Sequence, residues 1–137
     1  MTDDDTRPYL LVVDDNVEWA ELIEEVATRT GYRVSTAASA VAALEVIEKE
    51  APDLVVSDIF MPEMDGIELI WELGKLPKKP ALMLISGNVA PILKAAENLA
   101  RENGFDVIGA FAKPMRLGNL REALDGAMNR GESDAPE

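Results

Sequence analysis

The chain has 137 residues, of which 47% are hydrophobic and 28% are charged, and its formal net charge is −13. This length suits one domain with a single core, and the absence of cysteine and histidine excludes Ser-His-Asp and Cys-His nucleophilic sites, thiol redox chemistry and zinc sites built from these residues. The acidic charge argues against a nucleic-acid surface, and we find no membrane-spanning run or secretory signal, so we expect a cytoplasmic protein with no membrane partner.

Five short apolar runs, each bounded by polar residues, predict the strands of one sheet. These runs span residues 9–15, 32–37, 53–58 and 81–86, with a fifth strand inside 105–112. The first run is apolar until it ends in two aspartates, which is typical of a strand that is covered on both faces. We therefore expect a sheet that is buried between layers.

A segment with apolar residues at helical spacing follows each run, and this pattern predicts five helices. The apolar stripes are Trp19, Leu22, Ile23 and Val26 before Gly31; Ala40, Val41, Leu44 and Ile47 before Pro52; Ile67, Ile70 and Trp71 before Gly74; Ile92, Leu93, Ala96, Leu99 and Ala100 before Gly104; and Leu117, Leu120, Leu124 and Met128 before the polar residues 131–137. Strands that alternate with helices predict an α/β fold of the (βα)5 type, with a doubly wound five-stranded parallel sheet and helices on both faces. In such sheets ligands bind beyond the carboxyl ends of the strands.

Polar residues stand at the carboxyl ends of four predicted strands: Asp14 with Asp15, Asp58, Ser86 and Lys113. Each of them alone is typical of a turn or a helix cap. Together they converge on one edge of the predicted sheet. Three carboxylates repel one another there unless a cation joins them, and oxygen ligands suit Mg²⁺. We therefore predict a magnesium site.

Lys113 and the Ser86 hydroxyl add a positive charge and a hydrogen-bond donor beside the predicted metal site. A cation, a lysine and a hydroxyl together suit the oxygens of a phosphoryl group. A carboxylate can itself act as a nucleophile and carry an acyl phosphate. Asp58 is therefore a candidate for phosphorylation.

At this point the chain resembles the receiver domain of two-component response regulators, the CheY-like family. In these receivers an acidic pair follows the first strand, the phosphoacceptor aspartate ends the third strand ahead of Met-Pro and Asp-Gly, a Ser or Thr ends the fourth, and Lys-Pro follows the fifth. The chain carries these residues at 14–15, 58, 61–62, 65–66, 86 and 113–114. The resemblance covers residues 8–129 and implies a flavodoxin-like sheet with strand order 2-1-3-4-5.

The resemblance also implies how the site is used. Asp58 would be the phosphoacceptor, and Mg²⁺ would be bound by Asp15, Asp58 and the backbone carbonyl of Phe60, with Asp14 helping through water. Phosphorylation would adjust a loop and a helix, because a phosphoryl group adds about −1.5 to −2 charges.

The resemblance further implies a switch next to the site. Ser86 and Lys113 would contact the phosphoryl oxygens, and Ser86 would move toward the phosphoryl group. Phe111, an aromatic residue two positions before Lys113, would rotate inward behind Ser86. The fourth helix, fifth strand and fifth helix would then form the face that partners read.

Three features are less typical of receivers. Phe60 is bulky where many receivers have a polar or flexible residue, and Asn88 is uncharged; both positions flank the path of the attacking water in that family. We expect Phe60 to affect the lifetime of the acyl phosphate, or else merely to pack against its loop. The segment from Ser86 to Lys113 is also several residues longer than usual, and would reshape the partner face.

The leading hypothesis is a stand-alone receiver that accepts a phosphoryl group from a partner histidine kinase or histidine phosphotransfer protein and signals to a downstream protein, as a monomer or a phosphorylation-dependent dimer. It would not turn over a substrate. Alternatives are a phosphate sink or shuttle, and a receiver whose output lies in another domain or protein, such as a cyclic-dinucleotide phosphodiesterase. An aspartate-nucleophile phosphatase, a nucleotide or flavin binder and a degenerate receiver fit the motifs less well.

The expected domain organisation is simple. Residues 1–7 form an acidic N-terminal tail, residues 8–129 form the receiver domain, and residues 130–137 form a flexible C-terminal tail. Acidic ends of this kind are typical of solvated segments that aid solubility.

Overall fold

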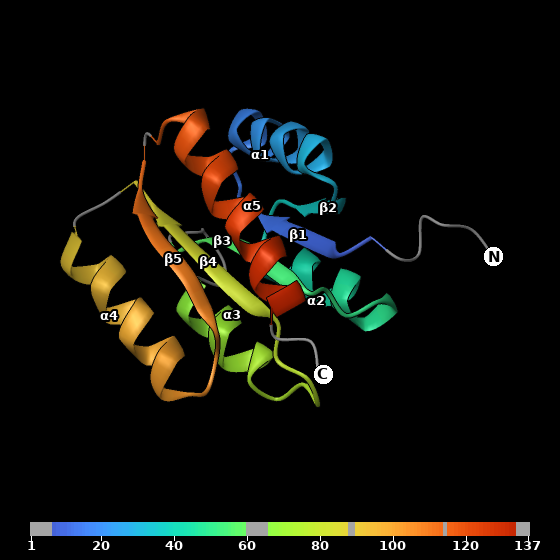
Figure 1. The fold of residues 1–137 in the computed structure, drawn as a ribbon. Helices are drawn as coiled ribbons and strands as arrows, with labels where there is room; N and C mark the ends of the chain where they lie inside the picture. Colours follow the sequence, from blue (N-terminus) through green and yellow to red (C-terminus); the bar gives the residue numbers. More distant parts are fainter. Residues whose placement is uncertain (1–6, 60–65, 88–89, 114, 134–137) are drawn as a thin grey trace.

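A computed structural model of the chain describes residues 7–59, 66–87, 90–113 and 115–133, although not the side chains of 66–67, 90–92 and 129–133. These residues form one five-stranded sheet in the order β2-β1-β3-β4-β5 (Figure 1). The strands are β1 (Tyr9–Val13), β2 (Arg33–Ala37), β3 (Leu54–Asp58), β4 (Ala81–Ser86) and β5 (Val107–Ala112). Every neighbouring pair is parallel, which confirms the predicted fold and strand order.

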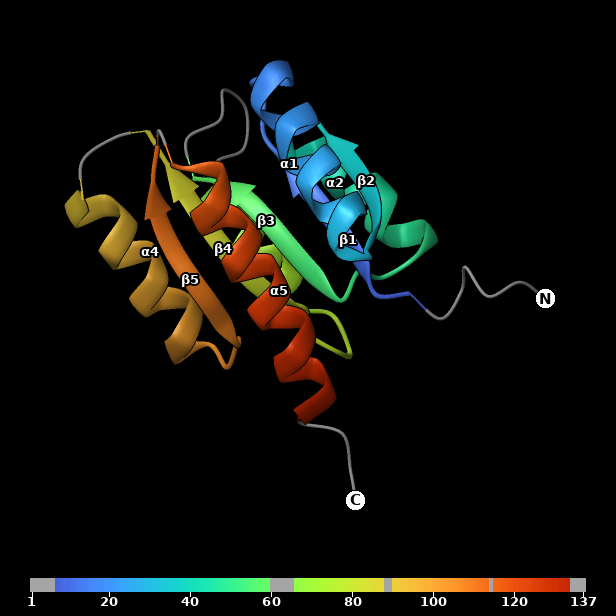
Figure 2. The ribbon, with the colours of Figure 1, turned by 45° about the horizontal axis from the view of Figure 1, so that its top comes forward.

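Five helices alternate with the strands and cover both faces of the sheet. They are α1 (Val17–Thr30), α2 (Ala40–Lys49), α3 (Gly66–Leu73), α4 (Ala90–Glu102) and α5 (Leu117–Ser133). One hydrophobic cluster joins α1 and α5 to one face of the sheet, and a second joins α2, α3 and α4 to the other. We call these the α1–α5 face and the α2–α3–α4 face; Figure 2 shows α1 and α5 in front of the sheet. The expected single core is therefore divided in two by the sheet.

The central strands are buried because helices cover them on both sides. All five residues of β1 and of β3 are buried, whereas the edge strand β2 is partly exposed. The first four helices end shortly before the glycine or proline that predicts their end. The Asn16 side chain accepts a hydrogen bond from the Trp19 amide at the start of α1, and Gly31 follows α1 with a φ of 120°, a conformation that favours glycine.

The structure corrects several predicted details. β1 ends at Val13, so both aspartates that follow lie in the loop before α1. α5 continues to Ser133, which places residues 130–133 of the expected flexible tail in a helix. Four residues assigned to apolar stripes are exposed, namely Leu22, Val41, Trp71 and Leu117. They lie at the margins of stripes whose centres are buried, and a helix pressed on a flat sheet leaves its flanks in solvent.

The segment between Ser86 and Lys113, which we expect to be longer than usual, contains among its described residues one helix of 13 residues, α4, and then a short connection to β5. The connection includes Gly104, which has a φ of 88°, and Phe105, which is buried in the core of the α2–α3–α4 face. Among the described residues, no helix is both long enough and apolar enough to cross a membrane.

Candidate functional site

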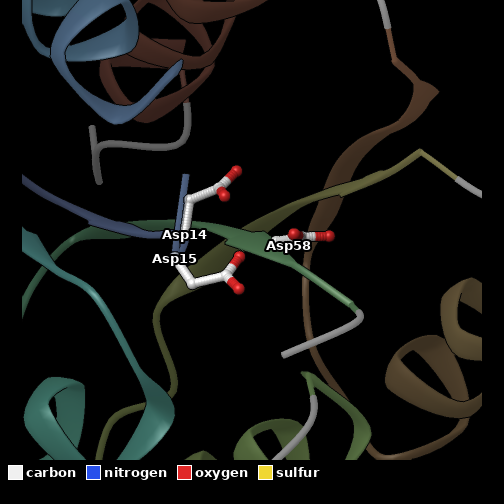
Figure 3. A group of neighbouring side chains, drawn as sticks. All are labelled: Asp14, Asp15 and Asp58. Carbon is white, nitrogen blue, oxygen red and sulfur yellow. The ribbon is translucent and has the colours of Figure 1, made fainter. Parts of the chain in front are cut away.

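Three aspartates lie together at the carboxyl edge of the sheet, where β1 and β3 are neighbours. One carboxylate oxygen from each of Asp14, Asp15 and Asp58 lies within 4.8 Å of the other two (Figure 3). Asp14 is only 2% exposed and Asp58 only 7%, whereas Asp15 is open to solvent. The structure thus brings together the three carboxylates that the sequence placed at the ends of two different strands.

The backbone around Asp14 fixes its side chain. The Asp14 amide donates a hydrogen bond to the carbonyl of Ala37, which continues the β1–β2 pairing one residue past the strand. The Asn16 amide then donates to Asp14 Oδ1 at 2.9 Å, closing a tight turn before α1. One carboxylate oxygen is therefore committed to the turn, and the other faces the centre of the site.

Lys113 brings a positive charge to the aspartates from the end of β5. Its Nζ lies 2.9 Å from Asp14 Oδ2 and 3.5 Å from Asp58 Oδ2. The contact with Asp14 is an ion pair without an aligned hydrogen bond, since Oδ2 has no hydrogen-bond partner in the described part of the chain. The Lys113 amide donates to the Ser86 carbonyl at 2.8 Å, which fixes the lysine beside β4.

The charges of the site do not balance. Among the described residues, three carboxylates face one ammonium, so two negative charges remain when all these groups hold their ordinary charge. Placing like charges together in a partly buried site costs free energy unless a cation joins them. The ligands available are hard carboxylate oxygens, and one buried oxygen, Asp14 Oδ2, has no hydrogen bond to satisfy it. These residues fit a divalent cation such as Mg²⁺.

Ser86 lies at the end of β4 and is fully buried. Side chains alternate along a strand, so Ser86 points to the same side as Leu82 and Leu84, which belong to the core of the α2–α3–α4 face. The hydroxyl therefore reaches the carboxyl edge from that side of the sheet.

The structure corrects the expected place of Phe111. In the β4–β5 register Phe111 pairs with Ile85, and both pack on the α1–α5 face, so Phe111 lies on the opposite side of the sheet from Ser86. On the side of Ser86, β5 places Ala110, which pairs with Leu84 and packs against the other core, and Ala112, which pairs with Ser86 itself. On the side of Ser86, β5 therefore presents small side chains in place of the expected aromatic ring.

The ring of Phe111 leans back along its own strand. A Cβ atom added to Gly109 would lie 2.6 Å from Phe111 Cζ, and it would meet Cε2 as well. Side chains two residues apart in a strand share a face, so the ring occupies the space above Gly109 because that residue has no side chain.

Sequence analysis missed one residue of this neighbourhood, Trp19. The centre of its indole ring lies 5.8 Å from Lys113 Nζ, within the range of a cation–π interaction. The helical stripe correctly indicated that Trp19 packs against the core, but a stripe carries no information on which polar group touches the outer edge of a side chain.

Several residues of the predicted site lie outside the described part of the chain. Phe60 and Asn88, which we expect to affect acyl-phosphate lifetime, are among them, as is the Phe60 carbonyl that we expect to bind metal. The same applies to Pro114 and to the Met-Pro pair at 61–62.

The sequence-family model of the response regulator receiver domain matches residues 10–125, so the chain belongs to the response regulator receiver family. Its fold, strand order and cluster of strand-end residues agree with this assignment. Receiver domains are signalling modules of two-component systems, and they take phosphoryl groups from kinases or phosphotransfer proteins.

Individual proteins show the same relationship. The chain is 30% identical over 117 residues to sporulation initiation phosphotransferase F of Bacillus subtilis, covering 84% of this chain and 89% of that protein. It is 35% identical over 129 residues to the transcriptional regulatory protein GlrR of Escherichia coli, covering 93% of this chain. A CheY-like receiver domain protein from Methanospirillum hungatei has a similar crystal structure, with a TM-score of 0.80, 25% identity and coverage of 94% and 99% of the two chains.

The relatives differ greatly in length. The chain spans 27% of GlrR and 19% of the rice two-component response regulator ORR26, to which it is 32% identical over 120 residues. The match with these longer proteins is therefore confined to a fraction of each.

Proposed function

We propose that Asp58 accepts a phosphoryl group, in the presence of Mg²⁺, from a histidine kinase or a histidine phosphotransfer protein. One observation carries this proposal. In a chain of the receiver family, the buried Asp58 carboxylate lies beside Asp14 and Asp15, and Lys113 Nζ lies 3.5 Å from it. A carboxylate nucleophile, a divalent-cation site and a fixed ammonium are the groups that phosphoryl transfer needs.

The proposed transfer is a single displacement. An oxygen of Asp58 attacks the phosphorus of a phosphohistidine, an O–P bond forms and the N–P bond breaks. The imidazole nitrogen keeps the electron pair of the broken bond and takes a proton from solvent. The chain contains no histidine, so the phosphohistidine lies outside it. Because the modified group is Asp58 itself, we propose that the domain has no turnover substrate.

Several residues would assist this transfer. Asp14, Asp15 and Asp58 would hold Mg²⁺, with the carbonyl of Phe60 as a further ligand. The bound metal would neutralise charge on the phosphoryl oxygens. The Lys113 backbone amide is hydrogen-bonded to the Ser86 carbonyl, and the Lys113 ammonium would contact one of those phosphoryl oxygens. The Ser86 hydroxyl would donate a hydrogen bond to another.

We further propose that phosphorylation is read at the face formed by α4, β5 and α5. A phosphoryl group adds about −1.5 to −2 charges at the carboxyl edge of the sheet. This change is enough to shift a nearby loop and helix between two conformations. Ser86 stands on the α4 side of this region and Phe111 on the α5 side. The two residues would thus act on different sides of β5 rather than as one stacked pair.

A second candidate is a phosphate shuttle, in which Asp58 passes its phosphoryl group to another histidine. The observation that favours it is the match with sporulation initiation phosphotransferase F, which extends over 89% of that protein and whose name describes phosphoryl transfer. A shuttle would lose its label on addition of an unphosphorylated phosphotransfer protein, whereas a signalling receiver would keep its label until it hydrolyses.

The central test is the intact mass of the protein after incubation with acetyl phosphate and Mg²⁺. We expect one phosphoryl adduct on the wild-type protein and none on Asp58→Ala. Asp125→Asn is the matched control, because Asp125 is an exposed acid on α5, and it should label like the wild-type protein. An unlabelled wild-type protein, or equal labelling of wild type and Asp58→Ala, would refute the proposal. Omission of Mg²⁺ should abolish labelling.

A further inference from the structure

Trp19 lies in the first turn of α1, beside the ammonium of Lys113. Its backbone amide donates to the Asn16 cap at 3.1 Å, which fixes the position of its Cα next to the site. Its side chain packs against the core of the α1–α5 face, together with Phe111 and Met115. The indole therefore closes the site from the side of α1, with its ring centre 5.8 Å from Lys113 Nζ.

Within the described part of the chain, three neighbours act on the charge of Lys113. Asp14 and Asp58 attract the ammonium at 2.9 Å and 3.5 Å, and the electron-rich face of Trp19 attracts it from a third direction. A lysine side chain is a flexible chain of four carbons, so two carboxylates alone leave it many orientations. The indole restricts these orientations because it is rigid and held in the core.

Among the described residues, no hydrogen bond to the indole N–H holds the Trp19 ring in place. Trp19 Nε1 is buried, and within the described part of the chain it has no hydrogen-bond partner. An unpaired buried N–H destabilises the folded state, and a purely apolar residue would fill this part of the core without that cost. The ring packing and the contact with Lys113 are what remain to account for an indole at this place.

We propose that Trp19 is a positioning residue for Lys113. Its ring holds the ammonium between Asp14 and Asp58, where the ammonium can contact the oxygens of an incoming phosphoryl group. This inference rests on the proposed phosphorylation of Asp58, which supplies the step that the lysine would assist. Trp19 itself touches neither the donor nor the reacting atoms.

The first test compares the initial rates at which variants are labelled by acetyl phosphate with Mg²⁺. Trp19→Leu keeps an apolar side chain but removes the aromatic face, and we expect labelling to slow by about three- to tenfold. Trp19→Phe keeps an aromatic face and should recover most of the rate. Val26→Ala, which trims the same helix within the same cluster, is the control for general loosening and should label at nearly the wild-type rate.

This comparison separates positioning from packing. If Trp19→Leu labels like the wild-type protein, or if Trp19→Phe is as slow as Trp19→Leu, then the aromatic face does not act on Lys113 and the inference is wrong. Unfolding in urea is measured for each variant. Trp19→Phe should be about as stable as the wild-type protein, because it removes the unpaired N–H along with part of the ring.

The second test does not depend on phosphorylation. The chain has two tryptophans, and Trp71 lies on α3 and is 61% exposed, so Trp71→Phe leaves Trp19 as the only indole. In that background we expect Lys113→Met to change the intensity and the wavelength of the Trp19 emission, whereas the exposed control Lys78→Met should not. Unchanged emission in Lys113→Met would overturn the inference. If Lys113→Met changes the Trp19 emission in that background but the wild-type protein acquires no phosphoryl adduct, the proposed function is refuted and the contact between Trp19 and Lys113 stands.

Discussion

Lys113 lies closer to Asp14 than to Asp58, by 2.9 Å against 3.5 Å. Asp14 is also the more deeply buried of the two, and its other oxygen is held by the Asn16 amide. The ammonium is therefore paired most closely with the acid that the turn before α1 holds in place, and its contact with the proposed acceptor is the longer of the two. A tight ion pair withdraws electron density from a nucleophile, so the longer contact suits Asp58.

Gly109 offers a direct test of how the Phe111 ring is seated. In Gly109→Ala the new methyl group would collide with the ring, which would have to leave its place on the α1–α5 face. We expect a loss of about 1–3 kcal/mol in the free energy of unfolding, typical of overpacking, measured by urea denaturation. Gly126→Ala is the control, because nothing lies within 4 Å of the added Cβ, and it should be neutral or stabilising by up to about 1 kcal/mol. Similar free energies of unfolding for the two variants would contradict the position of the Phe111 ring over Gly109.

Phe60 is the residue from which we expect behaviour particular to this protein. It follows the proposed acceptor by two positions, and a bulky side chain there would hinder water from reaching the acyl phosphate. We predict that Phe60→Asn loses its phosphoryl group about threefold faster or more, which corresponds to ~0.7 kcal/mol in the barrier. The measurement is the decay of the phosphorylated mass after removal of the donor. A decay rate equal to that of the wild-type protein would show that Phe60 has no such role.

At the scale of elements, β5 separates two chemically different sides. Ala110 faces the core beneath α4, and Phe111 faces the core beneath α5, while the β4–β5 pairing shifts register between Leu82 and Met83. The aromatic residue of this strand is thus available to α5 and α1 but not to Ser86. A signal that passes through Phe111 would reach α5 first.

Tyr32 ties the start of β2 to α5. Its hydroxyl donates to the Leu124 carbonyl at 2.8 Å, across 92 residues of sequence. Burial, followed by the negative charges of Asp125 and Asp53, raises the pKa of Tyr32 to about 12. The neutral phenol is therefore favoured in the folded state, and its contribution to stability is complete below pH 10, the ordinary pKa of tyrosine, and is lost as the pH rises toward 12.

This linkage predicts alkaline destabilisation. From the pKa difference we expect the free energy of unfolding to fall by roughly 2 kcal/mol between pH 9.5 and 12 on account of Tyr32. Tyr32→Phe should be less stable near pH 8, by about 1 kcal/mol for the lost hydrogen bond, but its stability should depend less on pH above 10. Tyr9→Phe is the control for the loss of a tyrosine hydroxyl, because the Tyr9 hydroxyl also donates a hydrogen bond, to Ser35. Parallel pH profiles for all three proteins would contradict the assignment.

At the scale of the whole molecule, the sequence predicted the architecture well for a physical reason. Apolar runs such as 81–86 are the buried strands, and periodic stripes are the buried faces of helices, so pattern and burial have the same cause. The strand-end residues could be predicted as a group because parallel strands deliver their carboxyl ends to one edge. Asp14, Asp58 and Lys113 meet there as expected.

Other features depend on contacts that no local pattern records. The side of the sheet on which Phe111 lies follows from its pairing with Ile85, and spacing from Lys113 alone does not give that pairing. The proximity of Trp19 to Lys113 joins residues that are 94 positions apart. The exposure of Trp71 on α3 depends on which face of that helix lies against the sheet, and the short apolar stripe of α3 does not specify this face.

The composition of β5 has a mechanical consequence. Three of its last four residues are Gly109, Ala110 and Ala112, so at this point little more than backbone separates the two cores. Small side chains pass a displacement of the strand on to the residues packed against them, because they cannot absorb it by changing rotamer, and Phe111 is the only large side chain among these four residues. Any rearrangement beneath α4 would therefore press directly on the packing beneath α5, and the smallest residues of the strand would set how stiffly the two halves of the molecule are coupled.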